Sequence, residues 1–141
     1  APHWDSRAVG MYYGMTRLTG KAELVKAGLE SIAYQITDVV LAMEEESGIP
    51  IGELRVDGGP TRNRYLMQFQ SDMAGIPVSV PPVEELSGIG AAYAAGIAMG
   101  IYDREQLFAR MGRRTFRPAM DSGTRDMKYG GWKHAVAKVL E

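Results

Sequence analysis

The sequence of 141 residues has no cysteine, only two histidines and almost no excess of charge, with a formal net charge of −1. Without cysteine it forms no disulfide and no thiolate metal site, which suits a reducing compartment. A near-neutral chain also has no electrostatic reason to bind nucleic acid or an anionic membrane surface. We therefore expect a cytoplasmic protein with neither nucleic acid nor membrane as a partner.

The sequence predicts neither a signal peptide in its first residues nor a membrane-spanning run. Residues 1–5, Ala-Pro-His-Trp-Asp, lack the basic segment and apolar run of a signal peptide. Segment 87–102 is apolar, but it is too short and too rich in glycine for a transmembrane helix. The first residue is not Met, and the opening resembles the inside of a loop. We therefore expect a piece of a longer protein that is large enough for one core.

Several kinds of catalytic site are also missing. There is no Walker-type loop and no glycine-rich loop followed by lysine, so nothing here is built to hold phosphates. His3 and His134 are far apart and form no metal constellation. The acidic pairs Glu44-Glu45 and Glu84-Glu85 fall at a helix end and a loop edge, where we expect them to be solvated. We predict no catalytic residue and no metal ligand in this chain.

Hydrophobic periodicity predicts an alternation of strands and helices. In residues 25–43 apolar side chains recur every three or four positions, and Ser47-Gly48 ends this long helix. Its solvent-exposed face is expected to include Lys26, Glu30, Asp38 and Glu44–Glu46. We expect further helices at 62–74, 87–102, 103–111 and 122–140, and strands at 9–16, 53–57 and 76–80. The basic run Arg110, Arg113, Arg114 and Arg117 is interpreted as a solvated linker. This order indicates an α/β fold, with a mainly parallel sheet flanked by helices.

The junction at 54–63, Leu-Arg-Val-Asp-Gly-Gly-Pro-Thr-Arg-Asn, is the most informative stretch. It predicts a short strand, a turn at Gly58-Gly59, and a helix capped by Thr61. Glycines without Cβ atoms let a flat ligand approach the main chain, and the helix N-terminus opens beside them. Such junctions bind nucleotides in α/β folds, although a plain connection between strand and helix is an equal alternative.

Several spaced motifs resemble those of one family, the FGGY carbohydrate kinases. They are Gly10 to Met15 followed by Glu23 to Glu30, then Leu54 to Gly59 with Asn63 and residues 66–72, and finally Gly90 to Tyr93. Val9, Gly28 and Pro60 depart from the usual pattern of the family. Both ends of the chain are most similar to the members that phosphorylate glycerol.

The resemblance implies a ribonuclease H-like, actin-like ATPase fold. Residues 1–141 would be a partial C-terminal, adenosine-binding domain that is incomplete at its N-terminal side, without the N-terminal sugar-binding domain. The resemblance also implies that Gly58 shapes the turn, that adenosine lies against Gly59, and that Asn63 hydrogen-bonds the adenosine. A sheet lacking its first strands would have an unpaired edge, and we expect a neighbouring chain or aggregation to cover it.

The activity implied is transfer of a phosphoryl group from ATP, with Mg²⁺, to a hydroxyl of a polyol or sugar. Glycerol is the acceptor that the resemblance favours most. The aspartate base, the phosphate loops and the Mg²⁺ ligands would lie outside this chain, which alone would be inactive. A homo-oligomer is expected of the full-length protein. The alternatives are a xylulose, other ketose or polyol kinase of the same family, and a non-enzymatic actin-like ATPase module.

Overall fold

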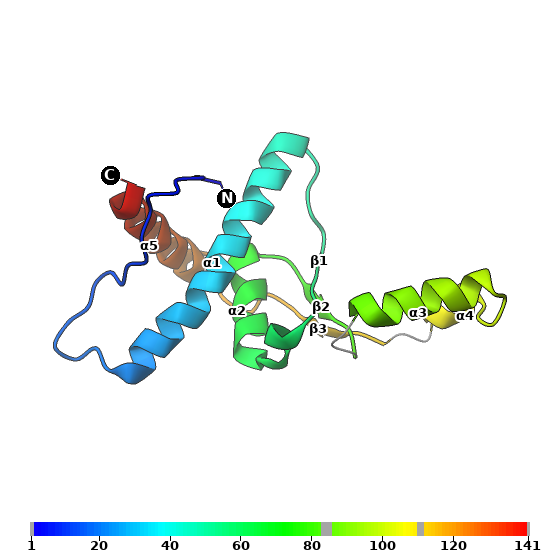
Figure 1. Ribbon diagram of the computed structural model, residues 1–141. Helices are drawn as coiled ribbons and strands as arrows, with labels where there is room; N and C mark the ends of the chain where they lie inside the picture. Colours follow the sequence, from blue (N-terminus) through cyan, green and yellow to red (C-terminus); the bar gives the residue numbers. More distant parts are fainter. Residues whose placement is uncertain (1, 83–85, 110–111, 141) are drawn as a thin grey trace.

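The computed structural model describes residues 2–82, 86–109 and 112–140 (Figure 1). Five helices, three strands and one 3₁₀ turn occur in these residues. In chain order they are α1 (Lys21–Ser47), β1 (Leu54–Arg55), the 3₁₀ turn η1 (Gly59–Arg62), α2 (Arg64–Ala74), β2 (Val78–Val80), α3 (Leu86–Ala98), α4 (Arg104–Ala109), β3 (Arg114–Phe116) and α5 (Ser122–Leu140).

Helix α1 begins and ends where its sequence predicts. At its start, Glu23 Oε2 accepts the backbone N–H of Gly20 at 2.9 Å, which satisfies one of the unpaired donors of the first turn. At its end, Gly48 takes φ 67°, and its N–H donates to the carbonyl of Glu44 at 2.9 Å. This left-handed residue closes the helix as glycine commonly does.

The core lies where α1 crosses α2 above the sheet. Apolar side chains from α1, α2 and the strands form one buried cluster: Ala33, Leu66, Met67, Phe69, Met73, Val78, Val80 and Phe116. Tyr34 of α1 meets Phe69 of α2 edge to face, with ring centroids 5.4 Å apart. Figure 1 shows the two helices crossing at the centre of the molecule. Burial of this cluster is the main source of stability of the body.

The sheet is small and mixed, with strand order β1-β2-β3. β1 runs parallel to β2, with Leu54 opposite Val78, as the alternation of strands and helices predicts. β3 runs antiparallel to β2, with Phe116 opposite Val78. Within the described residues β1 and β3 each have a neighbouring strand on one side only. The sheet therefore has two open edges there.

Strand β3 corrects the interpretation of the basic run as a linker. Arg114 opens the strand with its side chain exposed, while Phe116 is buried against the core. The segment forms a strand despite its polar residues because Phe116 is buried and because the backbone of β3 pairs with β2. Arg113 and Arg117 flank the strand and are exposed, and Arg110 lies outside the described residues.

Two smaller predictions also require correction. Residues 9–16 form no strand, because no other described segment pairs with their backbone, and Gly14 takes φ 80°. Helix α3 ends at Ala98, short of the predicted Tyr102, and Gly100 turns the chain with φ 71°. Helix α5 (Ser122–Leu140), by contrast, has the predicted bounds. Asp103 caps α4, since its Oδ1 accepts the N–H of Gln106 at 2.8 Å.

Helices α3 and α4 lie away from the body, on the far side of the sheet from α5 (Figure 1). None of the described helices is long and apolar enough to cross a membrane. The turn between β1 and α2, where the sequence predicts the candidate site, belongs to the body formed by α1, α2 and the sheet.

Candidate functional site

The turn after β1 is held by hydrogen bonds to one carbonyl. The oxygen of Gly58 accepts both the N–H of Thr61, at 3.1 Å, and the Thr61 hydroxyl, at 2.7 Å. Thr61 is 6% exposed, so it fixes the 3₁₀ turn from beneath. The prediction that Thr61 caps the following helix is wrong. Its hydroxyl donates backward to Gly58 and is turned away from the helix.

Asn63 is the N-cap of α2. Its Oδ1 accepts the N–H of Leu66 at 3.1 Å, and its own N–H donates to the carbonyl of Pro60 at 3.1 Å. The side chain therefore satisfies one loose donor of the first helical turn. Its other polar atom, Nδ2, has no partner among the described residues. Asn63 is half-buried at the point where the N-terminus of α2 opens beside the turn.

The two glycines of the turn differ in what they permit. Gly58 takes φ 89°, a conformation that side-chain-bearing residues rarely adopt. Gly59 has no such requirement, and a Cβ built on it meets no atom within 4 Å. Gly58 therefore serves the backbone, whereas Gly59 leaves open space beside an exposed main chain. The absence of a side chain at Gly59 matters only to something that approaches from outside.

Acidic groups near the turn form no metal site. Asp57 is exposed, and no cluster of three metal-ligating side chains occurs in the described ranges. Glu44 is not simply solvated, because its Oε1 accepts the N–H of Ile51 at 2.7 Å and holds the loop that leads to β1. The pair Glu84-Glu85 lies outside the described residues.

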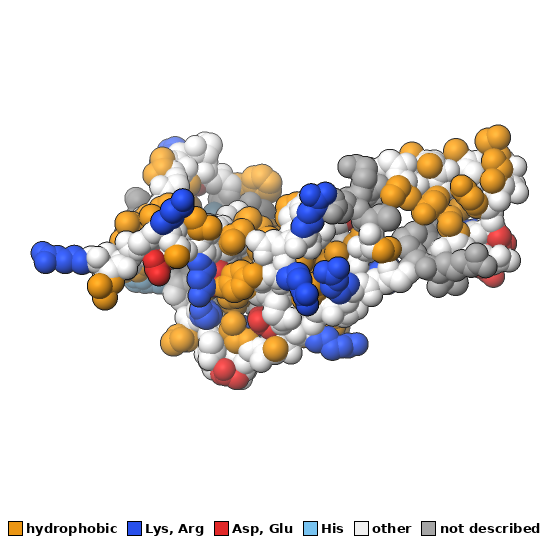
Figure 2. All heavy atoms as spheres, turned by 90° about the horizontal axis from the view of Figure 1, so that it is seen from below, with side chains coloured by type: hydrophobic (Ala, Val, Ile, Leu, Met, Phe, Trp, Pro, Cys, Tyr) orange, Lys and Arg blue, Asp and Glu red, His pale blue; other side chains and the backbone are white. Residues whose placement is uncertain are grey.

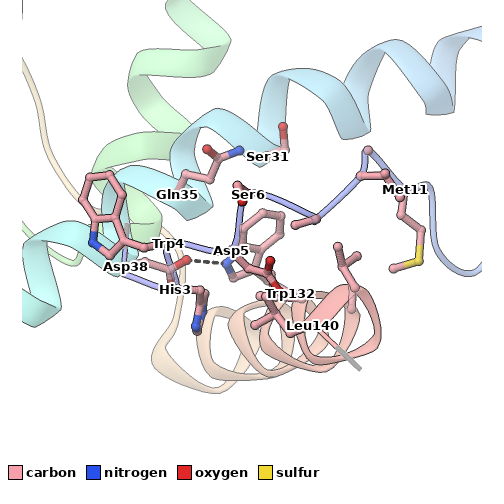
Figure 3. Close-up of a pocket in the computed structure, with 16 residues that line it drawn as sticks. His3, Trp4, Asp5, Ser6, Met11, Ser31, Gln35, Asp38, Trp132 and Leu140 are labelled. Atoms are coloured by element: carbon pink, nitrogen blue, oxygen red, sulfur yellow. Dashed lines mark hydrogen bonds between the residues drawn. The ribbon is translucent and has the colours of Figure 1, made fainter.

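Apart from the turn, a hollow lies between the N-terminal segment, α1 and α5 (Figure 3). Its volume is about 580 Å³, and neither Gly59 nor Asn63 lines it. Asp38 accepts the Tyr129 hydroxyl at 2.6 Å and the indole N–H of Trp132 at 2.8 Å. Trp132 in turn stacks on Tyr34, with ring centroids 5.3 Å apart. Burial, and then the bond to Asp38, raise the pKa of Tyr129 above its ordinary value.

These contacts explain how α5 is attached. The sequence places Asp38 on the solvated face of α1, yet it receives two donors from the last helix. Tyr129 and Trp132, three residues apart on one helix face, are the signal that could have indicated a buried acceptor. His3 also lines the hollow, while Nε2 of His134 lies 3.1 Å from the Tyr13 hydroxyl. The two histidines remain in separate contacts.

Comparison with known proteins identifies the family. The profile of the FGGY family of carbohydrate kinases, C-terminal domain, matches residues 1–99. The glycerol kinase of Carboxydothermus hydrogenoformans is 49% identical over all of this chain, which covers 29% of that protein. The glycerol kinase of Geobacillus kaustophilus is also 49% identical, over 99% of this chain and 28% of its own length. The chain thus spans less than a third of these relatives.

Solved structures agree with the sequence comparison. The crystal structure of Plasmodium falciparum glycerol kinase with ADP matches all of this chain and 29% of that one, with TM-score 0.88 and 36% identity. Xylulose kinase from Lactobacillus acidophilus, at 20% identity and TM-score 0.69 over 93% of this chain and 26% of its own, shares the fold. These likenesses confirm the predicted actin-like ATPase fold. The matched profile and the 49% identity over the whole chain show that the protein belongs to the FGGY family of carbohydrate kinases.

Proposed function

We propose that this chain supplies the adenosine-binding part of an ATP-dependent kinase that converts glycerol to glycerol 3-phosphate. The relatives named glycerol kinase at 49% identity, and the similar structure that holds ADP, support this assignment. The single observation that carries it is the turn. Gly59 opens exposed main chain to a flat ligand, and the Nδ2 atom of Asn63 is available beside it.

In this proposal the residues of the turn divide the work. Gly58 sets the path of the chain, Gly59 lies under the adenosine, and Asn63 donates from Nδ2 to an acceptor on the base or ribose. Oδ1 of Asn63 stays bonded to Leu66, so the amide is already oriented before the ligand arrives. Pre-orientation reduces the entropy lost on binding.

The remaining parts of the reaction belong to residues outside these 141. Phosphoryl transfer depends on Mg²⁺, on groups that hold the phosphates and on a residue that positions the attacking hydroxyl. We place the Mg²⁺ ligands among those outside residues. We accordingly propose that the isolated chain does not phosphorylate glycerol. We also propose that the full-length protein is a cytoplasmic homo-oligomer.

The adenosine site is tested by variants that separate binding from folding. In the full-length kinase, Gly59→Ala places a methyl group in open space, so it leaves stability unchanged and weakens ADP binding about tenfold or more. Gly52→Ala is the matched control, because a Cβ there also meets nothing within 4 Å. Calorimetric titration with ADP measures both. Equal ADP affinity in the two variants contradicts the site.

Asn63 offers a second, independent test. Asn63→Asp retains an oxygen that can cap α2, but it removes the Nδ2 donor. We expect its unfolding midpoint to stay near that of the parent while ADP binding weakens. Asn63→Ala loses both functions, with about 1 kcal/mol of stability lost with the cap. If the two variants bind ADP as the parent does, Asn63 is a helix cap only.

A different acceptor is the main alternative. Xylulose kinase from Rhodospirillum rubrum matches 96% of this chain, with TM-score 0.74 and 25% identity. Identity is higher to the relatives named glycerol kinase, at 36% for the solved structure and 49% for the relative from Carboxydothermus hydrogenoformans, which favours glycerol. A panel of glycerol, xylulose, ribulose, gluconate and erythritol, assayed with the full-length enzyme, distinguishes them. Preference for a ketose would overturn the glycerol assignment and leave the adenosine site intact.

A further inference from the structure

Thr61 is the buried centre of the candidate adenosine turn. Of the described residues 57–65 it alone is buried, at 6% exposed, whereas Gly59 is exposed and Asn63 is half-buried. It lies midway between these two residues in the sequence. A side chain in this place acts on a bound ligand through its neighbours and not by contact.

The hydroxyl of Thr61 makes the shorter of two hydrogen bonds to one acceptor, the carbonyl of Gly58. The hydroxyl donates at 2.7 Å, and the backbone N–H of the same residue donates at 3.1 Å. The backbone bond belongs to a 3₁₀ turn of only four residues, Gly59–Arg62. Hydrogen bonds of this type have poorer geometry than those of an α-helix, so a turn this short has little stability of its own. The hydroxyl bond therefore contributes much of what keeps the turn closed.

The same hydroxyl bond fixes the most permissive residue of the turn. Gly58 has φ 89° and ψ 176°, and a glycine can leave this conformation for many others. Thr61 holds its carbonyl in place. The next, overlapping turn joins the N–H of Asn63 to the carbonyl of Pro60 at 3.1 Å. Together the two turns determine where the exposed main chain at Gly59 lies relative to Asn63.

We propose that Thr61 is a positioning residue for the adenosine of ATP, because its hydroxyl orders the turn before the nucleotide binds. This inference rests on the adenosine site proposed above, and it assigns part of the affinity of that site to a residue that does not touch the ligand. Without the hydroxyl the turn samples more conformations, and the nucleotide must order it on binding. The loss falls on nucleotide affinity, since the groups that hold the phosphates and the acceptor lie outside these 141 residues.

Two threonine variants of the full-length kinase test this role. Thr61→Val removes the hydroxyl and keeps the branched shape of the side chain. Thr37→Val on α1 is the matched control, because Thr37 is 2% exposed and its hydroxyl donates to the carbonyl of Ala33 at 2.8 Å. Each variant loses one hydroxyl-to-carbonyl bond, so the two unfolding midpoints should fall by similar amounts. In calorimetric titration, ADP should bind about fivefold more weakly to Thr61→Val and with parent affinity to Thr37→Val.

Steady-state kinetics give a readout that a loss of stability alone would not change. In Thr61→Val the KM for ATP should rise about fivefold, while kcat and the KM for glycerol stay at the parent values. Thr61→Ser keeps a hydroxyl and should restore the parent affinity for ADP. The proposal is overturned if the two valine variants bind ADP equally well, if kcat falls with the KM for ATP unchanged, or if Thr61→Ser does not restore binding.

Gly59→Ala separates this inference from the adenosine site itself. If Gly59→Ala weakens ADP binding and Thr61→Val does not, the adenosine site stands and the role of Thr61 is wrong. If neither variant weakens binding, both proposals are wrong. Thr61→Ala and Thr37→Ala repeat the comparison where a valine variant does not fold. Failure of both Thr61 variants to fold would show that the hydroxyl serves the whole fold, and would also overturn the proposal.

Discussion

Helices α2 and α3 are similar in length but opposite in environment. α2 is amphipathic, with Leu66, Phe69 and Met73 each no more than 4% exposed. α3 contains no charged residue from Leu86 to Ala98, yet most of its described side chains face solvent. Figure 2 shows hydrophobic side chains gathered over the α3 and α4 end of the molecule. The composition of α3 is that of a helix buried on all sides.

The difference shows where stability resides. α2 is packed between α1 and the sheet, so each side chain on its inner face contributes apolar burial. α3 is instead in contact with its own following loop, where Tyr93 meets Tyr102 edge to face at 6.0 Å between ring centroids. Substitutions should therefore have large effects in α2 and small effects in α3.

Phe69→Ala is expected to have the largest effect. It leaves a cavity beneath Tyr34 and Leu66 and should cost about 3–5 kcal/mol of unfolding free energy. Tyr93→Ala on α3 is the control, with an expected loss below about 1 kcal/mol. Urea unfolding followed by circular dichroism measures both. Similar losses for the two variants would show that α3 is as firmly packed as α2.

Asp38→Ala extends the comparison to α5. It removes the acceptor of Tyr129 and Trp132, and leaves two donors half-buried without a partner. Hydrogen bonds to a charged group contribute more than neutral ones, so we expect a loss of about 2–3 kcal/mol. Asp126→Ala, which removes an exposed carboxylate on α5, should change stability by less than about 0.5 kcal/mol.

Tyr129→Phe should lower the unfolding free energy by less than Asp38→Ala does. If the losses in the Asp38→Ala, Tyr129→Phe double variant are not additive, Asp38 and Tyr129 act through one contact. If Asp38→Ala matches Asp126→Ala, the docking of α5 rests on apolar contacts alone.

Local signals predicted most of the elements that pack on one another. The period of apolar residues and the glycine that follows each helix predict α1 and α2, and the sequence also predicts the two-glycine turn. The cap was assigned to Thr61 when Asn63 performs it, because two residues with similar capping chemistry compete within one turn. The sequence alone does not show which of two neighbouring side chains accepts the free N–H groups of the helix.

The elements that were missed depend on distant partners. β3 exists because β2 lies beside it, and its arginines conceal that fact. Asp38 accepts a hydrogen bond because Trp132, 94 residues further along the chain, lies beside it in the fold. Residues 9–16 show the reverse case, in which a sequence suited to a strand has no described partner. Pairing is a property of two segments, so one segment cannot predict it.

High pH should loosen the aromatic contacts of the body. Burial raises the pKa of Tyr34 from its ordinary 10.0 to about 12, and the pKa values of Tyr65 and Tyr129 are raised in the same direction. A raised pKa in the folded state means that folding favours the protonated hydroxyl. Its stabilisation is therefore complete below pH 10 and is lost as the pH rises toward 12.

The unfolding midpoint measured across this interval should fall, with phenolate absorbance reporting the ionisation. In Tyr34→Phe the fall should be smaller, because one of the three shifted groups is gone. An unchanged slope in that variant would show that Tyr34 takes no part in the alkaline loss of stability.

Gly96→Ala on α3 should produce the smallest change of stability. A Cβ at this position would lie 2.3 Å from Cδ2 of Tyr102, so the tyrosine must move. Tyr102 is 45% exposed, which gives its ring room to rotate toward solvent at the cost of its contact with Tyr93. Alanine is also favoured over glycine within a helix by about 1 kcal/mol, which offsets that loss. We expect a net change within about 0.5 kcal/mol in the unfolding free energy. A loss above 2 kcal/mol would mean that Tyr102 cannot move, and that the end of α3 is held by packing as rigid as that around Phe69.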